Sequence, residues 1–84
     1  MVTVPEIKKT SLKYQFRDIL LDITWAKIAK RYFEKSPSWL YHKLDGIDGN
    51  GNVDEFSYSE KLQLKNALCD LAYRIRATAE TIDV

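Results

Sequence analysis

Apolar residues recur at steps of three and four along most of this chain, which is the spacing of one helical face. The first run of this kind predicts a helix over Leu12–Ile23, with the hydroxyl of Ser11 as its N-cap. Residues 1–9 lack this periodicity and are interrupted by Pro5, so we expect a mobile N-terminal arm. Residues 10–84 then form a single helical domain, because a chain of 84 residues is near the smallest size that folds alone.

Two short helices are predicted in the centre of the chain. The first starts after Thr24, a capping residue, and its pattern ends at Lys35. Ser36 and Pro37 indicate the start of the next helix, because serine caps a helix and the fixed φ of proline suits the first helical position. Proline also disfavours helical geometry in the residue before it, which ends the preceding helix. The following helix runs to about Leu44.

The second half of the chain combines a polar loop with one long helix. Residues 45–56 contain all three glycines, and their Asp-Gly and Asn-Gly pairs predict a turn-rich loop or a small β-hairpin tip. Ser57 and Glu60 have the spacing of a capping box, and a long apolar stripe follows them to about Thr81. The expected fold is therefore all-α, with about four helices. The central pair would pack on the first helix and the long C-terminal helix.

The central pair, Thr24–Leu44, has the pattern of a helix-turn-helix, in which a short turn joins two crossing helices. Ala29 is small where the two helices would approach closely. Leu40 and Leu44 are one helical turn apart, so both can pack over Ala29, and Phe33 would close the end of the pair.

Eight residues of this unit form a recognisable pattern, namely Ile28, Ala29, Phe33, Ser36, Leu40, Leu44, Asp45 and Gly46. The pattern resembles the repressor-type helix-turn-helix of the Cro and lambda-repressor class. In that class an Ile/Leu-Ala pair opens the unit, a serine or threonine caps the recognition helix and a Leu-Asn-Gly-like ending follows. The capped helix that begins after Phe56 is also similar to that class. The resemblance implies DNA binding.

A second motif comprises Tyr32, Phe33, Lys35, Ser36, Ser38, Trp39, Leu40 and Tyr41. It resembles a family of short uncharacterised proteins of intestinal bacteria, and this resemblance covers most of the chain from residue 10 onward.

The chain departs from the repressor pattern in two ways. Phe33 stands where that class has a glycine in the turn, and the spacing from Ala29 to the aliphatic residue of the next helix is one residue longer. The turn is thus either a lengthened variant or part of a helical hairpin that does not contact DNA.

Charge is distributed unevenly, although the net charge is only +1. Residues 1–44 contain nine Lys or Arg and four Asp or Glu, whereas residues 45–84 contain four and eight. The basic half indicates an anionic partner. Cys69 is the only cysteine, so an internal disulfide is excluded, and its apolar neighbours predict a core position. With no signal peptide and no apolar run near the roughly 20 residues of a membrane span, we expect a cytoplasmic protein that does not use a membrane.

If the helix after Pro37 reads DNA, the exposed residues near its N-terminal end would face base edges. Cations of the preceding helix and the amides at its start would bind phosphates. The predicted DNA-binding residues are Lys27, Lys30, Arg31, Lys35, Ser36, Ser38, Tyr41, His42 and Lys43. The expected partner is double-stranded DNA, and the expected function is that of a small transcriptional regulator from a mobile element. Such regulators often act as homodimers.

An alternative role uses the same scaffold without nucleic acid. The long C-terminal helix would then bind another protein, and the chain would be an adaptor or an assembly factor. The basic residues of the central pair would in that case be an ordinary solvated face.

The polar loop does not fit a calcium site. Asp48, Asn50 and Asn52 match the first three ligand positions of an EF-hand. Val53 stands where the sharp turn needs glycine, and Ser59 stands where the bidentate glutamate is needed.

Catalytic chemistry has little support in the sequence. His42 and Cys69 fall in different predicted helices with no acid–base group beside them, and no glycine-rich phosphate loop or Cys/His metal spacing is found. We therefore expect no enzyme activity, no cofactor, no metal and no small-molecule substrate.

Overall fold

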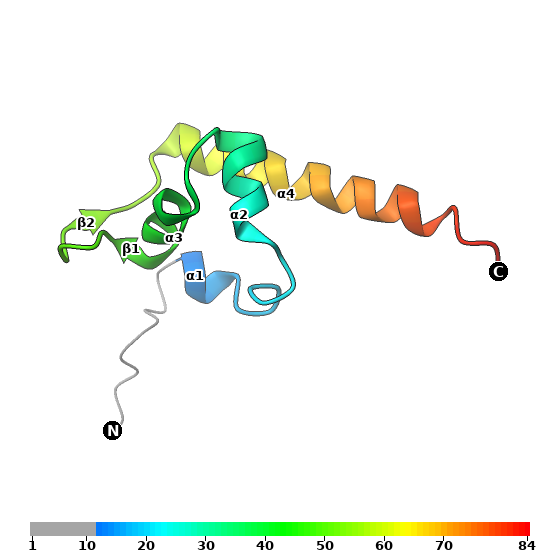
Figure 1. Ribbon diagram of the computed structural model, residues 1–84, viewed down its shortest axis with the longest axis horizontal. Helices are drawn as coiled ribbons and strands as arrows, with labels where there is room; N and C mark the ends of the chain where they lie inside the picture. The colour runs from blue at the N-terminus through cyan, green and yellow to red at the C-terminus, as the bar shows by residue number, and fades with distance from the viewer. Residues whose placement is uncertain (1–11) are drawn as a thin grey trace, which may run out of the picture.

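The computed structural model describes residues 12–84, so the expected N-terminal arm and the Ser11 cap lie outside the described residues. The elements are α1 (Leu12–Gln15), α2 (Trp25–Ile28), the π-helix η1 (Ala29–Phe33), α3 (Pro37–Asp45), β1 (Gly46–Ile47), β2 (Val53–Asp54) and α4 (Tyr58–Ala79). α2 continues directly into η1. Figure 1 shows α1, α2 and α3 gathered beside the first half of α4, whereas the second half of α4 extends away from this body.

The expectation of an all-α fold is wrong, because a two-stranded antiparallel hairpin follows α3. The paired residues are Gly46 with Asp54 and Ile47 with Val53. Asp48 organises the turn, since its carboxylate accepts hydrogen bonds from the amides of Asn50 at 2.8 Å and Asn52 at 3.0 Å. The small hairpin is one of the two alternatives predicted for residues 45–56, and the structure confirms it. Each strand has only two residues, so the turn residues and not an alternating strand pattern indicate it.

The first helix is much shorter than the predicted Leu12–Ile23. α1 ends at Gln15, and the chain then makes successive turns. The amide of Ile19 donates to the carbonyl of Phe16 at 2.9 Å, and the amide of Asp22 donates to that of Ile19 at the same distance. Apolar residues three and four apart are thus brought toward the core by turns instead of by a continuous helix.

Contacts with Trp25 account for this difference. Its indole nitrogen donates to the carbonyl of Leu20 at 2.8 Å, and this carbonyl would otherwise accept a helical bond from Thr24. Its ring also stacks on Phe16, with 5.8 Å between centroids and 3° between planes. The aromatic contact favours a folded-back segment, which local periodicity alone does not reveal.

The helix after Thr24 differs from the prediction in its second half. Thr24 precedes α2, but its side chain makes no capping hydrogen bond. A π-helical turn holds more residues than an α-helical one, so η1 accommodates the longer spacing between Ala29 and Leu40. The chain leaves η1 through Glu34, whose φ of 56° is left-handed, and the amide of Lys35 donates to the carbonyl of Ala29 at 3.1 Å. The turn therefore forms without glycine.

The two predicted helix starts with serine caps are confirmed. The hydroxyl of Ser36 accepts from the amide of Trp39 at 3.2 Å, and Pro37 is the first residue of α3. At the start of α4, the hydroxyl of Ser57 accepts from the amide of Glu60 at 3.2 Å. The Glu60 carboxylate in turn accepts from the Ser57 amide at 2.8 Å, which completes the capping box.

One apolar core joins α2, η1, α3, the segment between β2 and α4, and α4 itself. Ala29, Leu40 and Leu44 are at most 1% exposed and lie in one buried cluster, in agreement with their predicted packing. The rings of Phe33, Trp39 and Phe56 pack against one another at one side of this cluster, with 5.1 Å between the centroids of Phe33 and Trp39. The other buried members are Trp25, Ile28, Phe33, Phe56, Leu64 and Ala67. The two central helices are held rigidly by this cluster.

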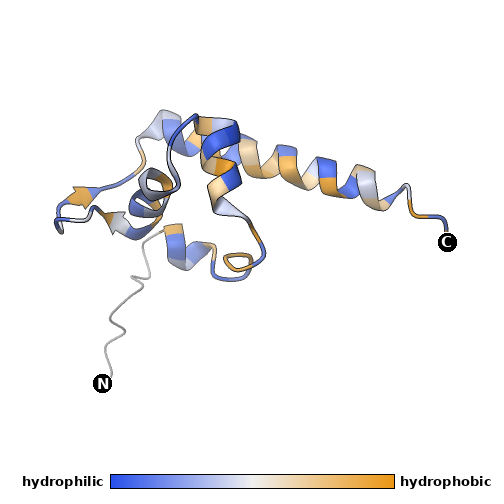
Figure 2. Cartoon of the chain, viewed as in Figure 1, coloured by the Kyte–Doolittle hydropathy of each residue, from blue (hydrophilic) through white to orange (hydrophobic). Residues whose placement is uncertain are grey.

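Only the first part of α4 is buried. Leu64 and Ala67 belong to the core, whereas every residue from Ile75 to Val84 is exposed. Apolar residues nevertheless recur along the whole helix, the extended half included (Figure 2). The core position predicted for Cys69 is wrong, because α4 turns this residue away from its buried face and leaves it exposed.

Candidate nucleic-acid interface

Tyr32 fixes the basic helix η1 against α4. Its hydroxyl donates to the carboxylate of Asp70 and accepts from the guanidinium of Arg74 at 3.2 Å. Its carbonyl accepts from the side-chain amide of Gln63 at 2.6 Å. These bonds satisfy a π-helical carbonyl and hold the cations that precede and follow Tyr32 in a defined place.

An open groove of about 650 Å³ runs beside the N-terminal end of α3. Predicted DNA-binding residues contribute much of its lining, and Glu34 is its only acidic residue. The groove is lined by Ala26, Lys27, Lys30, Glu34, Lys35, Ser36 and Pro37. The fold thus brings four of the nine predicted site residues to one concave surface.

The cations at this surface are free to bind an anion. Lys27, Lys30 and Arg31 are exposed, and none of them forms an ion pair with another residue in the range 12–84. The ammonium of Lys35 lies 5.7 Å from the ring centroid of Trp39, a cation–π contact that orients the lysine at the entrance of α3. We call these four residues the basic surface.

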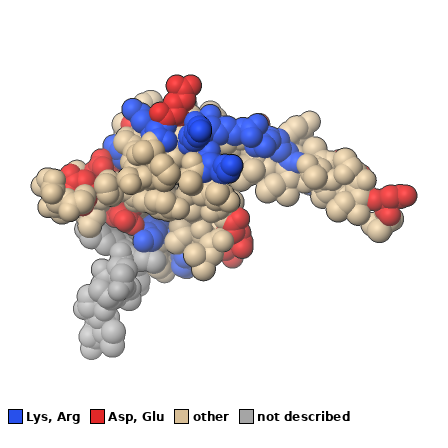
Figure 3. Space-filling view, in the orientation of Figure 1, with Lys and Arg blue, Asp and Glu red and all other residues tan. Residues whose placement is uncertain are grey.

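Charge is distributed unevenly over the surface. On the face shown in Figure 3, Lys and Arg side chains form a band over α2, η1 and the adjoining part of α4, and acidic side chains lie at the upper edge of this band, on the hairpin side, on the lower side and at the far end of α4. The partial positive charge at the N-terminal end of α3 adds to the basic side. α3 therefore has a positive end and a negative end.

The first turns of α3 expose polar groups to solvent. Ser38 is exposed, and Tyr41 is 46% exposed although it belongs to a helix with buried leucines. The Ser36 hydroxyl accepts the capping bond from the Trp39 amide, and its own hydrogen can still be donated to a ligand.

Lys43 is held by acidic neighbours, and its ammonium lies 5.5 Å from the centroid of the same Trp39 ring that Lys35 contacts. Its ammonium is 3.0 Å from a carboxylate oxygen of Asp54 and 3.6 Å from one of Glu60, and it donates to the carbonyl of Glu55 at 3.2 Å. Its side chain is only 15% exposed. The hydrogen bond to Asp54, with the charge of Glu60, raises the pKa of Lys43 although burial acts in the opposite direction.

His42 also faces the hairpin instead of the basic surface. It is half-buried, and its Nε2 would lie 4.0 Å from a β-carbon at Gly49. Hydrogen bonds from the amides of Asn52 and Asn50 lower the pKa of the nearby Asp48, and the charge of His42 contributes further in the same direction. Neither His42 nor Lys43 therefore lines the groove beside the start of α3.

A sequence profile described as "Domain of unknown function (DUF5053)" matches residues 12–82. This chain belongs to the DUF5053 family. The match spans every element from α1 to α4, so the groove and the basic surface lie wholly within the DUF5053 domain. No curated protein and no solved structure matches the chain.

Sequence analysis missed one cation of the DUF5053 domain that adjoins the basic surface. Arg74 of α4 lines a second groove, of about 320 Å³, together with Lys27, Arg31 and Tyr32. No local motif connects Arg74 with the central pair, because only the packing of α4 on η1 brings them together. Arg74 is partly engaged with Asp70, at 3.9 Å, and with Tyr32.

In the described part of the chain, no three His, Cys, Asp or Glu residues are grouped as metal binding requires. Within the same range, α4 and the shorter helices lack the combination of length and apolar character that a membrane-spanning helix has.

Proposed function

We propose that this chain is a small DNA-binding protein that acts in the cytoplasm as a transcriptional regulator. One observation carries the proposal. Lys27, Lys30 and Lys35, which have no acidic partners among the described residues, line one groove beside the N-terminal end of α3, where helix amides add further positive potential. Arg31 lies in the adjoining groove that Lys27 also lines. A regularly spaced row of phosphates is the ligand class that such a surface fits best.

The arrangement favours one orientation on a duplex. Lys27, Lys30, Arg31 and Lys35 would contact phosphates, while the first turns of α3 would enter the major groove. Ser38 and Tyr41 would then face base edges. The acidic hairpin at the other end of α3 would point away from the duplex, because carboxylates near phosphates repel them.

The test is a fluorescence-anisotropy titration of labelled duplex DNA at about 50 mM salt, where contacts to phosphates are strongest. Lys35→Ala should weaken binding severalfold. Lys43→Met removes the same charge but from a side chain already paired with Asp54, so it should leave the affinity nearly unchanged. Absence of binding by the unaltered chain at low salt would refute the proposal.

A second candidate function is that of an adaptor that binds another protein through α4. The extended second half of α4, exposed from Ile75 onward, favours this alternative. If the chain binds no DNA but binds a helix of another protein through the extended half of α4, it is such an adaptor.

A further inference from the structure

The second groove, which lies between the central helices and α4, has three cations in its lining. Lys27 and Arg31 belong to α2 and η1, and Arg74 belongs to α4. Asp22 also lines this groove, but it forms no ion pair with any of the three within residues 12–84. Like charges around one groove repel one another, and an anion between them removes this repulsion. The lining therefore favours an anionic ligand.

The guanidinium of Arg74 is held in place through a single nitrogen. Its Nη1 donates to the hydroxyl of Tyr32 at 3.2 Å and lies 3.9 Å from a carboxylate oxygen of Asp70. No other nitrogen of this guanidinium forms a hydrogen bond with a residue in the range 12–84. The edge formed by Nε and Nη2 therefore keeps its N–H groups for a ligand, and two such groups match two oxygens of one phosphate.

Asp70 limits the net charge that Arg74 adds to the groove. The side chains of Arg74 and Asp70 are 42% and 48% exposed, so their attraction is weakened by water. At longer range, however, the carboxylate offsets the charge of the guanidinium. Arg74 thus supplies directed hydrogen bonds with little additional positive charge, in contrast to Arg31, which has no acidic partner within the same range.

We propose that the second groove holds one phosphate of the duplex backbone, which is bound by Arg31 from η1 and by Arg74 from α4. This inference rests on the proposed function and extends the duplex contact from the central helices to α4. Arg31 neutralises the phosphate, and Arg74 orients it through Nε and Nη2. Lys27 lines both grooves and so connects this phosphate with those beside the start of α3. The band of Lys and Arg side chains that runs from α2 and η1 onto α4 follows the same path (Figure 3).

Substitution of Arg74 tests the contact in a duplex titration at about 50 mM salt. Arg74→Gln should raise the Kd about tenfold, because hydrogen bonds to a charged group are lost. The slope of log K against log salt should stay unchanged, since Arg31 still neutralises the phosphate. Arg74→Lys keeps the charge but lacks the planar edge, so it should bind nearly as weakly as Arg74→Gln. Full affinity in Arg74→Lys would overturn the proposal.

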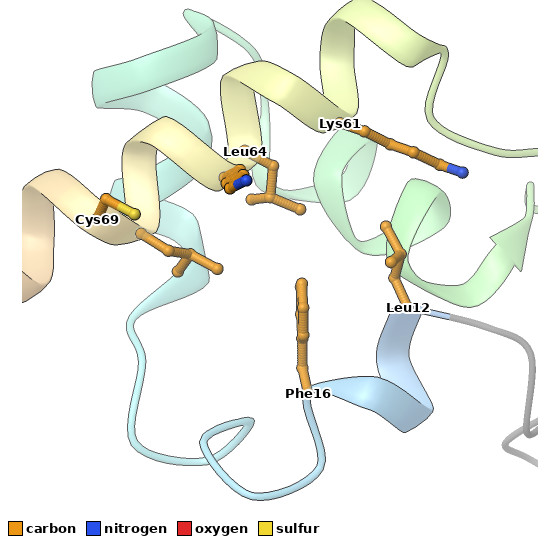
Figure 4. A pocket seen from close by; sticks show the side chains of 7 residues that line it. Leu12, Phe16, Lys61, Leu64 and Cys69 are labelled. Atoms are coloured by element: carbon orange, nitrogen blue, oxygen red, sulfur yellow. The ribbon is translucent and has the colours of Figure 1, made fainter.

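Lys65 provides the matched control for Arg74. It is an exposed cation of α4 that lies about two and a half turns before Arg74, on the opposite side of the helix. It lines the apolar groove between α1 and α4, where Leu12 and Phe16 lie opposite Leu64 (Figure 4). Lys65→Gln should therefore leave the Kd nearly unchanged. A loss of affinity equal to that of Arg74→Gln would show a general effect of charge and overturn the proposal.

A double-mutant cycle tests whether the two arginines share one phosphate. The effects of Arg31→Ala and Arg74→Gln should be coupled, so that the double variant binds more tightly than the product of the two single effects predicts. Lys30 lines only the first groove, so Lys30→Ala and Arg74→Gln should have independent effects. Independent effects for the two arginines would overturn the shared contact.

Tyr32→Phe separates a direct contact of Arg74 from an effect on the fold. This variant breaks the bond between η1 and α4 but keeps the guanidinium, so it should weaken binding less than Arg74→Gln does. Equal losses in both variants would show that Arg74 acts through the placement of η1 and would overturn the proposal.

The outcomes also separate this inference from the proposed function. If the unaltered chain binds no duplex at low salt, the proposed function fails and this inference fails with it. If the unaltered chain binds and Lys35→Ala weakens binding, but Arg74→Gln binds normally while circular dichroism shows it folded, only the phosphate contact at α4 is overturned.

Discussion

The ammonium of Lys43 lies 3.0 Å from a carboxylate oxygen of Asp54, and this ion pair joins the last turn of α3 to the second strand of the hairpin. A residue that sequence analysis placed at a DNA surface therefore connects two elements of the fold. The same cation also lies 3.6 Å from Glu60 of the α4 capping box. Lys43 thus stands where α3, the hairpin and α4 meet.

Replacement of Lys43 by methionine should lower the free energy of unfolding by about 1 kcal/mol, because the ion pair with Asp54 and the hydrogen bond to the Glu55 carbonyl are lost. Urea denaturation followed by circular dichroism measures this change. Lys30→Met is the matched control, because the side chain of Lys30 is exposed and forms no ion pair within residues 12–84. Its free energy of unfolding should change by no more than about 0.5 kcal/mol. Equal losses in both variants would contradict the structural role of Lys43.

Two groups of the hairpin region predict how stability depends on pH. The raised pKa of Lys43 contributes stability that is fully present below its ordinary value of 10.5 and is lost as the pH rises through the folded-state pKa. The lowered pKa of Asp48 contributes stability that is present above its ordinary value of 3.8 and is lost as the pH falls through the folded-state pKa.

Urea denaturation as a function of pH measures both contributions. Lys43→Met should flatten the alkaline decline only, and Asp48→Asn should flatten part of the acid decline only. If Lys43→Met altered the acid decline instead, or Asp48→Asn the alkaline decline, the assignment of the two pH-dependent contributions to these residues would be wrong.

Truncation of Leu40 to alanine should remove most of the stability of the domain. Leu40 is fully buried in the core, and deletion of such a side chain costs about 2–5 kcal/mol, which is a large part of what a chain this small possesses. Leu21→Ala is the matched control, since Leu21 is 96% exposed and its truncation should be nearly neutral. Thermal denaturation of the two variants distinguishes them, and similar midpoints would show that the core is placed incorrectly.

Glu34 predicts a substitution that stabilises the turn. A left-handed φ of 56° is strained for a residue with a β-carbon but not for glycine, so Glu34→Gly should raise the free energy of unfolding by roughly 0.5–1 kcal/mol. Glu34→Gln keeps the strain and removes only the charge, so it should leave stability nearly unchanged. Both variants remove the acidic residue of the groove and should bind DNA more tightly. A destabilising effect of glycine would contradict the left-handed turn.

The parts of the fold that the sequence predicts well are those fixed by neighbours within a few residues. The caps at Ser36 and Ser57 are local hydrogen bonds to residues three positions later, and both are present. The early end of α1 depends on Trp25, whose indole takes the carbonyl of Leu20, and helical periodicity does not report such a contact. The π-helix η1 is not predicted for the same reason, because the hydroxyl of Tyr32 is hydrogen-bonded to Asp70, which is far away in the sequence.

The candidate site divides in the same way. Lys27, Lys30 and Lys35 reach one groove because they lie on the adjoining helix and turn, which the sequence already places together. The contacts of Lys43 depend on the hairpin that supplies Asp54. The sequence indicates the hairpin tip, but no local pattern indicates that Asp54 pairs with Lys43. The resemblance to repressors stays a prediction.

The salt dependence of duplex binding tests the proposed DNA contact most directly. If the four cations of the basic surface each neutralise a phosphate, the logarithm of the association constant should fall with the logarithm of salt concentration at a slope of about −3.6. Lys30→Ala combined with Lys35→Ala should reduce the slope to about −1.8, because two phosphate contacts remain. The same slope in both proteins, or no measurable binding at low salt, would contradict the account.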